Sequence, residues 1–254
     1  TRFVGPSGVL WKVSHEKRTD LGRHSEGIDV RALAFGSEGC LGIITSAIIR
    51  VWPLPEVKTY GSVIFTQFND GLQFLKLLSR EPRTMPACVR LLDNAHFRLG
   101  QALRPDETSW LHEARDIIGK ALISLHKTSD FHTESVVCAT ISYEGSDREV
   151  REQMAKVSKL SRMYGGVLLG SRVGKAGYDL TYMIAYLRDF AMTYHVLGES
   201  FETFSPWSKI ESLIAATKER IVSEHTARLL PGVPFVGCRV TQLYHEGVCL
   251  YFYM

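Results

Sequence analysis

The chain has 254 residues, of which 45% are hydrophobic and 22% are charged, an ordinary composition that excludes disordered and fibrous proteins. Its net charge of +3 is spread without a basic block, which argues against a nucleic-acid-binding protein. No apolar run approaches the ~20 residues needed to cross a bilayer, so a soluble chain is expected.

The cysteines and histidines lack the spacing that metal or disulfide chemistry needs. The five cysteines form an odd set without a C-x-x-C pair, and the nine histidines never recur at i, i+4 on a plausible helix. We therefore expect reduced thiols, no disulfide framework and no metal site. The cysteines are Cys40, Cys88, Cys138, Cys238 and Cys249.

Both ends of the sequence are typical of an internal segment. The chain begins without Met, and a predicted strand over 9–13 soon follows the turn residues 5–8. It stops within an apolar run, 249–254, that has the pattern of a strand. We expect a fragment of a longer protein.

A glycine-rich turn follows the first helix. Asp29 can cap a short helix over 30–35, and three glycines, Gly36, Gly39 and Gly42, then lead into a β-branched run over 43–51. Such a turn is usually structural, but a backbone without side chains can also approach a cofactor closely. No phosphate-binding consensus is present.

Paired prolines mark a domain boundary. Pro53 and Pro55 close the β-branched run, and the pattern of elements changes near Glu56. We expect one domain over 1–56 and a second over 57–254.

The second domain begins with two rounds of strand, helix and strand. Predicted strands cover 62–68, 87–92, 136–143 and 167–169. Asn69 or Asp70 can cap the first helix, and Ser146 to Glu149 is a capping box for the second. The pattern favours the α+β class, with an antiparallel or mixed sheet and helices on one face.

The remaining elements continue this alternation. Helices are expected within 105–123, over 178–194 and from Ser205-Pro206 onward, and strands over 196–203, 236–244 and 248–254. Residues 245–247 form a plausible hairpin turn in which Gly247 supplies a positive φ.

Four polar side chains could carry chemistry. Arg188 interrupts an apolar helix, so an unpaired, buried guanidinium would need an anion: either an acid such as Asp189 or Glu199, or a substrate phosphate. Arg90 lies alone between apolar neighbours in a strand, where alternation can simply turn it to solvent. Tyr251 is expected to pack in the core, although a phenol can transfer protons. Ser200 lacks the G-x-S-x-G context of a hydrolase nucleophile.

The glycine turn resembles a known flavoprotein motif. Residues 29–45, with G-S-E-G-C-L-G-I-I-T, and residues 51–56 look like the end of the PCMH-type FAD-binding domain of the vanillyl-alcohol-oxidase superfamily. Cys40 departs from the Thr common in the family. The motif implies the flavin fold but not the reaction.

Later motifs narrow the resemblance. They are similar, in order, to the alkyldihydroxyacetonephosphate synthase family, and they cover residues 90–94, 181–189, 197–203, 238–242 and 249–253. The resemblance implies ether-lipid synthesis: FAD-dependent, redox-neutral exchange of the acyl group of acyl-dihydroxyacetone phosphate for a long-chain fatty alcohol. It also implies that residues 57–254 form the substrate-binding cap domain.

The resemblance also implies roles for individual residues. Tyr251 matches a proton acceptor and donor, Arg188 a substrate-binding arginine that holds the phosphate, and Arg90 an arginine needed for activity near the flavin. Ser200 would line the substrate pocket. The flavin-contacting loop would consist of Glu38, Gly39, Cys40, Leu41, Gly42, Ile43 and Ile44.

The family further implies a homodimer that associates peripherally with a membrane in a peroxisome or glycosome. Its diphosphate-binding flavin loops should precede Thr1, and a histidine-rich segment should follow Met254. We therefore expect this chain alone to bind FAD poorly and to lack activity.

Two other functions remain open. An FAD-dependent D-2-hydroxy-acid dehydrogenase would share the glycine motif but would reduce its flavin with a 2-hydroxy acid. A non-catalytic relic would keep the fold alone, and the presence of Tyr251, Arg188 and Arg90 argues against it.

Overall fold

The computed structural model describes residues 2–11, 31–47, 49, 51–102, 117–119 and 135–254. They belong to two compact units, Thr1–Leu54 and Pro55–Met254, and the division falls within the proline-containing segment. The helix predicted within 105–123 lies outside the described residues except for 117–119.

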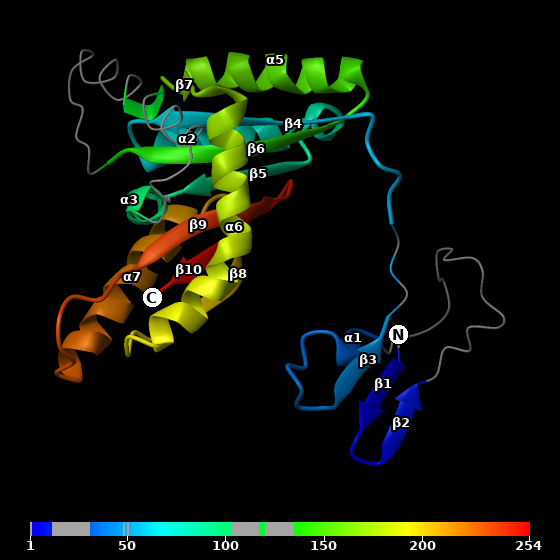
Figure 1. The fold of residues 1–254 in the computed structure, drawn as a ribbon, viewed down its shortest axis with the longest axis vertical. Coiled ribbons are helices and arrows are strands. Elements are labelled where there is room, and N and C mark those ends of the chain that lie inside the picture. The colour runs from blue at the N-terminus through cyan, green and yellow to red at the C-terminus, as the bar shows by residue number, and fades with distance from the viewer. Residues whose placement is uncertain (1, 12–30, 48, 50, 103–116, 120–134) are drawn as a thin grey trace. The chain divides into compact units, whose positions relative to one another are not determined.

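The first unit contains a small antiparallel sheet in the order β2-β1-β3 (Figure 1). Its strands are β1 (Arg2–Gly5), β2 (Gly8–Trp11) and β3 (Ile43–Ser46), and α1 (Arg31–Ala34) precedes β3. The helix and the second strand agree with the sequence prediction. β1 was not predicted, and β3 is shorter than the β-branched run.

The second unit is built on a seven-stranded sheet in the order β7-β4-β6-β5-β9-β10-β8, in which every pairing is antiparallel. Its strands are β4 (Val57–Phe65), β5 (Cys88–Leu92), β6 (Val137–Gly145), β7 (Val167–Leu168), β8 (Ser200–Pro206), β9 (Gly237–Leu243) and β10 (Gly247–Tyr253). The predicted α+β class is confirmed, and the sheet is antiparallel.

Helices cover both faces of this sheet, so the prediction of helices on one face was wrong. They are α2 (Phe68–Ser79), α3 (Asn94–Ala102), α5 (Asp147–Met163), α6 (Gly170–Met192) and α7 (Ile210–Ala227), with a 3-10 turn at Pro82–Thr84. α2, α5 and the start of α7 pack in the large core cluster, whereas α6 crosses the opposite face (Figure 1). Within the described residues, no helix is both long enough and apolar enough to span a bilayer.

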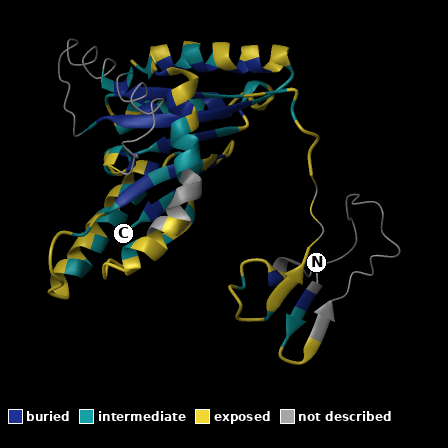
Figure 2. Ribbon diagram, in the orientation of Figure 1, coloured by how far each residue is buried: buried dark blue, intermediate teal, exposed yellow. Residues whose placement is uncertain are grey.

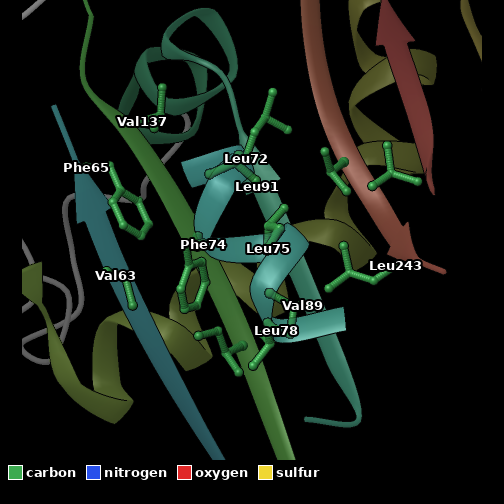
Figure 3. Packing of buried hydrophobic residues seen from close by; sticks show 14 of the residues in the cluster. Val63, Phe65, Leu72, Phe74, Leu75, Leu78, Val89, Leu91, Val137 and Leu243 are labelled. Atoms are coloured by element: carbon green, nitrogen blue, oxygen red, sulfur yellow. The ribbon is translucent and has the colours of Figure 1, made fainter. Parts of the chain in front are cut away.

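Alternation along β4 explains the two covered faces. Val63 and Phe65 point into the large cluster beneath α2, where Phe74 and Leu75 are fully buried (Figure 3). Ile64, between them, points to the other face and joins the smaller cluster with residues of α6. A strand buried on both faces reads as a continuous apolar run, but in β4 this run is only Val63 to Phe65, too short to indicate two helical layers from sequence.

The capping box predicted for α5 is present. Ser146 accepts a hydrogen bond at Oγ from the Glu149 backbone N–H, at 3.4 Å, and the Glu149 carboxylate accepts one from the Ser146 backbone N–H, at 2.7 Å. The exposed side of this helix is polar, and its buried side packs on the core (Figure 2).

α6 begins eight residues before its predicted start because glycines near its N-terminus allow close packing. A Cβ atom at Gly174 would lie 2.3 Å from the backbone oxygen of Gly61 in β4, and one at Gly177 would lie 2.6 Å from the Thr140 side chain in β6. Glycine lowers helix propensity, so the first eight residues of α6 carry no helix signal in the sequence. Their packing places the following residues of α6 over the sheet.

Two local predictions near the chain's end need correction. Ser205 and Pro206 belong to β8, and α7 starts only at Ile210. Gly247 does not have a positive φ. It is needed for space instead, because a Cβ atom there would lie 2.1 Å from the backbone oxygen of Ser205 in the neighbouring strand.

Candidate functional site

The face of the sheet opposite the large core is polar along β9 and β10. Cys238, Val240, Leu250 and Phe252 are fully buried in the core, so the residues between them in sequence point the other way. Arg239 pairs across the strands with Tyr251, which pairs in turn with Glu202 of β8. A guanidinium, a phenol and a carboxylate thus lie in one row.

Tyr251 and Ser200 are in direct contact. The Tyr251 hydroxyl and Ser200 Oγ lie 2.7 Å apart, and both residues are half-buried. β8 and β10 set this contact, because Ser200 is opposite Tyr253 and therefore diagonal to Tyr251. The structure thus brings together two residues that are 51 positions apart in sequence. A hydrogen-bonded phenol on a half-buried surface is suited to proton transfer.

Arg239 lies over the rings of two tyrosines. Its guanidinium carbon is 4.9 Å from the ring centre of Tyr251 and 5.3 Å from that of Tyr253. Burial lowers the pKa of Arg239, and Arg90 lowers it further, although the two tyrosines and Glu202 oppose the change. Burial also raises the pKa of Tyr253 to about 12, so this phenol stays protonated at neutral pH.

Arg90 does not point into bulk solvent. Its guanidinium carbon lies 5.0 Å from the ring centre of Tyr178 in α6, and its Nη1 is buried without a hydrogen-bond acceptor. The side chain is half-buried beneath this helix. The structure therefore excludes the reading in which alternation simply exposes Arg90.

Arg188 is not buried, contrary to the expectation from its apolar neighbours. Its side chain is 56% exposed, and Nη2 lies 3.4 Å from Glu199 Oε1. Glu199 is fixed beside the last strand, because its backbone N–H donates to the oxygen of Met254 at 2.8 Å and its own oxygen accepts from the Met254 N–H at 3.0 Å. Of the two partners weighed for Arg188, an acid and a phosphate, the structure shows the acid. Since Glu199 precedes Ser200, the ion pair lies one residue from the Ser200–Tyr251 contact.

The predicted flavin-contacting loop lies in the first unit and is largely exposed. Glu38 and Gly39 have φ values of 48° and 83°, and no atom lies within 4 Å of a Cβ built at Gly39. Gly42 is required by packing, because its Cβ would lie 2.5 Å from the Val4 backbone oxygen. The exposed Leu41, Ile43 and Ile44 follow. The turn therefore leaves its backbone open to a ligand, as the predicted cofactor contact requires.

Sequence reasoning missed Arg239 as a site residue. It is a lone cation between Cys238 and Val240, the same signal that drew attention to Arg90 between Val89 and Leu91. What the sequence could not provide is the strand order, which places β9 between β5 and β10.

A buried carboxylate supports this surface from behind. Asp93 accepts hydrogen bonds from the backbone N–H of His96 at 2.9 Å, from the Cys238 backbone N–H at 2.8 Å and from Lys218 Nζ at 2.6 Å. It therefore ties the start of α3 and helix α7 to β9, directly before Arg239. Among the described residues, no group of His, Cys, Asp and Glu could hold a metal ion.

Comparison with known proteins identifies relatives of the whole chain. Residues 54–254 match the family described as FAD-linked oxidases, C-terminal domain. The chain is 39% identical over 251 residues to an alkyldihydroxyacetonephosphate synthase of Caenorhabditis elegans, covering 99% of this chain and 41% of that protein. It is 26% identical to the enzyme of that name from Dictyostelium discoideum, of which it covers 39%.

A solved structure gives the same result. An alkyldihydroxyacetonephosphate synthase matches 99% of this chain and 43% of its own with a TM-score of 0.73 and 26% identity. The chain thus spans about two-fifths of the length of the relatives that it matches.

Proposed function

Because the chain belongs to the family of FAD-linked oxidases through their C-terminal domain, we propose that the protein containing it is an alkyldihydroxyacetonephosphate synthase of ether-lipid synthesis. Its reaction exchanges the acyl group of acyl-dihydroxyacetone phosphate for a long-chain fatty alcohol. The acyl group leaves as a fatty acid and the alcohol oxygen forms the ether bond, so electrons and atoms balance without an oxidant. The protein is then an alkyl-group transferase, although its fold is shared with oxidases.

The observation that carries the proposal is the contact of Tyr251 with Ser200 beside half-buried cations. In the exchange, the alcohol must lose a proton and the leaving carboxylate must be stabilised. In its phenolate form Tyr251 can accept this proton at its oxygen, and the resulting phenol can return it; Ser200 orients the side chain through the 2.7 Å contact. Arg90 and Arg188 supply positive charge for anionic substrate groups.

FAD would be held in part by the loop from Glu38 to Ile44, whose open turn and exposed apolar side chains fit an isoalloxazine ring. When bound, the flavin would supply an electron-accepting ring. Arg188 binds the substrate phosphate in this proposal, and the ion pair with Glu199 must open or rearrange first. Exposed ion pairs are worth only about 0 to 1 kcal/mol, so this requirement is small.

A labelled long-chain alcohol tests the proposed function. The full-length protein, loaded with FAD, is expected to place the label in an ether and to release one fatty acid for each ether formed, with no electron acceptor added. Reduction of the flavin by a D-2-hydroxy acid, without ether formation, would instead support the dehydrogenase. If the protein neither forms the ether nor reduces its flavin with a 2-hydroxy acid, the non-catalytic reading is supported.

The 254-residue chain by itself is expected to lack this activity and to bind FAD weakly, since its relatives are more than twice as long. An absorbance spectrum of the isolated chain after incubation with FAD and gel filtration measures the bound flavin. A stoichiometric flavin band would contradict the expectation. We further propose that the full-length protein is a homodimer that associates peripherally with a peroxisomal or glycosomal membrane.

A further inference from the structure

We infer that Arg90 and Arg239 together form an oxyanion-binding subsite beside Tyr251, which receives an anionic group of the substrate. The inference rests on the proposed function for the identity of the substrate, and it assigns a role to Arg239. The group bound is a carboxylate or a phosphate ester, since guanidinium groups bind the oxygens of both; a phosphate bound here would replace Arg188 in the role proposed for it above.

Strand pairing places the two guanidinium groups on the same face. Arg239 in β9 is opposite Leu92 in β5, so Arg90, two residues earlier, is its diagonal neighbour. The proximity has an electrostatic consequence, because Arg90 lowers the pKa of Arg239. Two like charges on a half-buried surface repel each other, and an anion bound between them offsets this repulsion.

Neither cation is neutralised within the described part of the chain. Arg90 Nη1 and Arg239 Nε are both buried and lack an acceptor there. Glu202 raises the pKa of Arg239 through its charge, but no ion pair between the two is found among the described residues, and Glu202 accepts a hydrogen bond from Thr241 Oγ1 at 3.4 Å. Arg188 differs, because Glu199 already satisfies it. Two donors that are buried and unpaired favour a ligand with oxygen acceptors.

The aromatic rings hold the two cations in place. Arg90 lies over Tyr178 from α6, and Arg239 lies over Tyr251 and Tyr253 from β10. Little side-chain freedom then remains to be lost on binding. An oxyanion held between them would lie on the same face of the sheet as Tyr251, whose ring packs against Arg239.

Binding of two simple probes to the full-length protein tests the subsite. Inorganic phosphate and decanoate are titrated separately by calorimetry into the wild type and into Arg239→Gln, Arg90→Gln and Arg239→Lys. We expect at least one probe to bind the wild type, and each glutamine variant to weaken it about 10- to 100-fold, the loss of a charge-assisted contact. Arg239→Lys should keep part of the affinity, because it retains the charge but not the fork. The probe affected identifies the group as phosphate or carboxylate.

Arg220→Gln is the matched control, since Arg220 is an exposed arginine of α7 paired with Glu224, and it should bind both probes as the wild type does. The inference is overturned if the wild type binds neither probe, or if Arg239→Gln and Arg239→Lys both bind them unchanged. Should Arg239→Gln fail to fold, Arg239→Lys decides. If the glutamine variants lose probe binding but the wild type forms no ether, the synthase is refuted and the oxyanion subsite is kept. If the wild type forms the ether but the glutamine variants bind the probes unchanged, the subsite is refuted and the synthase is kept.

Discussion

Replacing Tyr251 by Phe is expected to lower ether formation by about 10²- to 10⁴-fold, the usual contribution of a positioned acid or base. The change removes only the hydroxyl that lies 2.7 Å from Ser200 Oγ. The ring remains for Arg239 to pack on, so the strand arrangement should persist. The measurement is the initial rate of label transfer from alcohol to ether in the full-length protein, with FAD content and unfolding midpoint determined on the same sample.

Tyr244→Phe is the control for this change. Tyr244 is an exposed tyrosine beyond the end of β9, next to Phe204 and away from the Tyr251 hydroxyl in the strand register, so its loss should leave the rate unchanged. Ser200→Ala should cost less than Tyr251→Phe, about tenfold, because it removes one orienting hydrogen bond of about 1 kcal/mol. A Tyr251→Phe protein that retains more than a tenth of the rate would remove the phenol from the proposed chemistry.

The elements that sequence reasoning found are those with a local signal. The capping box from Ser146 to Glu149 and the apolar stripe of α5 are each formed by residues only a few positions apart, and both are present. The start of α6 at Gly170 and the whole of α3 were missed. α3 begins after Asp93, whose capping role can be recognised only once the end of β5 is known. Gly174 of α6 serves a contact with Gly61, more than 100 residues earlier in the chain.

The candidate site shows the same limit. Tyr251, Ser200 and Arg90 were found through a resemblance, and the residues themselves indicated only a phenol, a hydroxyl and a cation. The burial of Arg188 was predicted from its apolar neighbours on the helix. The exposure of a side chain depends instead on what packs against its own side of the helix, and Arg188 is exposed there and paired with Glu199. Arg239 became visible through its cross-strand neighbours: Tyr251 in β10, and Leu92 in β5, which lies 147 positions earlier in the chain.

Removing the Asp93 carboxylate is expected to destabilise the protein by about 2 to 6 kcal/mol, because two buried backbone N–H groups lose their acceptor at about 1 to 3 kcal/mol each. Asp93→Ala leaves the buried Cys238 N–H without its acceptor, removes the cap on the His96 N–H and releases Lys218. Lys218 is partly exposed and can regain water, so most of the cost comes from the two backbone groups. The midpoint of urea unfolding of the full-length protein at neutral pH measures the loss.

The pH dependence separates the charge of Asp93 from its shape. Burial raises the pKa of Asp93, but hydrogen bonds from His96 and the charge of Lys218 outweigh burial and hold the pKa below its ordinary value. A carboxyl whose pKa is lower in the folded state stabilises the protein above its unfolded pKa of about 4, and this stability is lost as the pH falls through the folded value. Asp93→Asn keeps the acceptor oxygen for α3 and removes the titration. Its deficit relative to the wild type should therefore be largest at neutral pH and shrink on acidification, whereas the exposed Asp189→Asn should show no deficit at either pH. A deficit that stays constant from pH 7 to below pH 4 would mean that Asp93 acts through packing and hydrogen bonds alone, and that its charge does not hold α7 against the sheet.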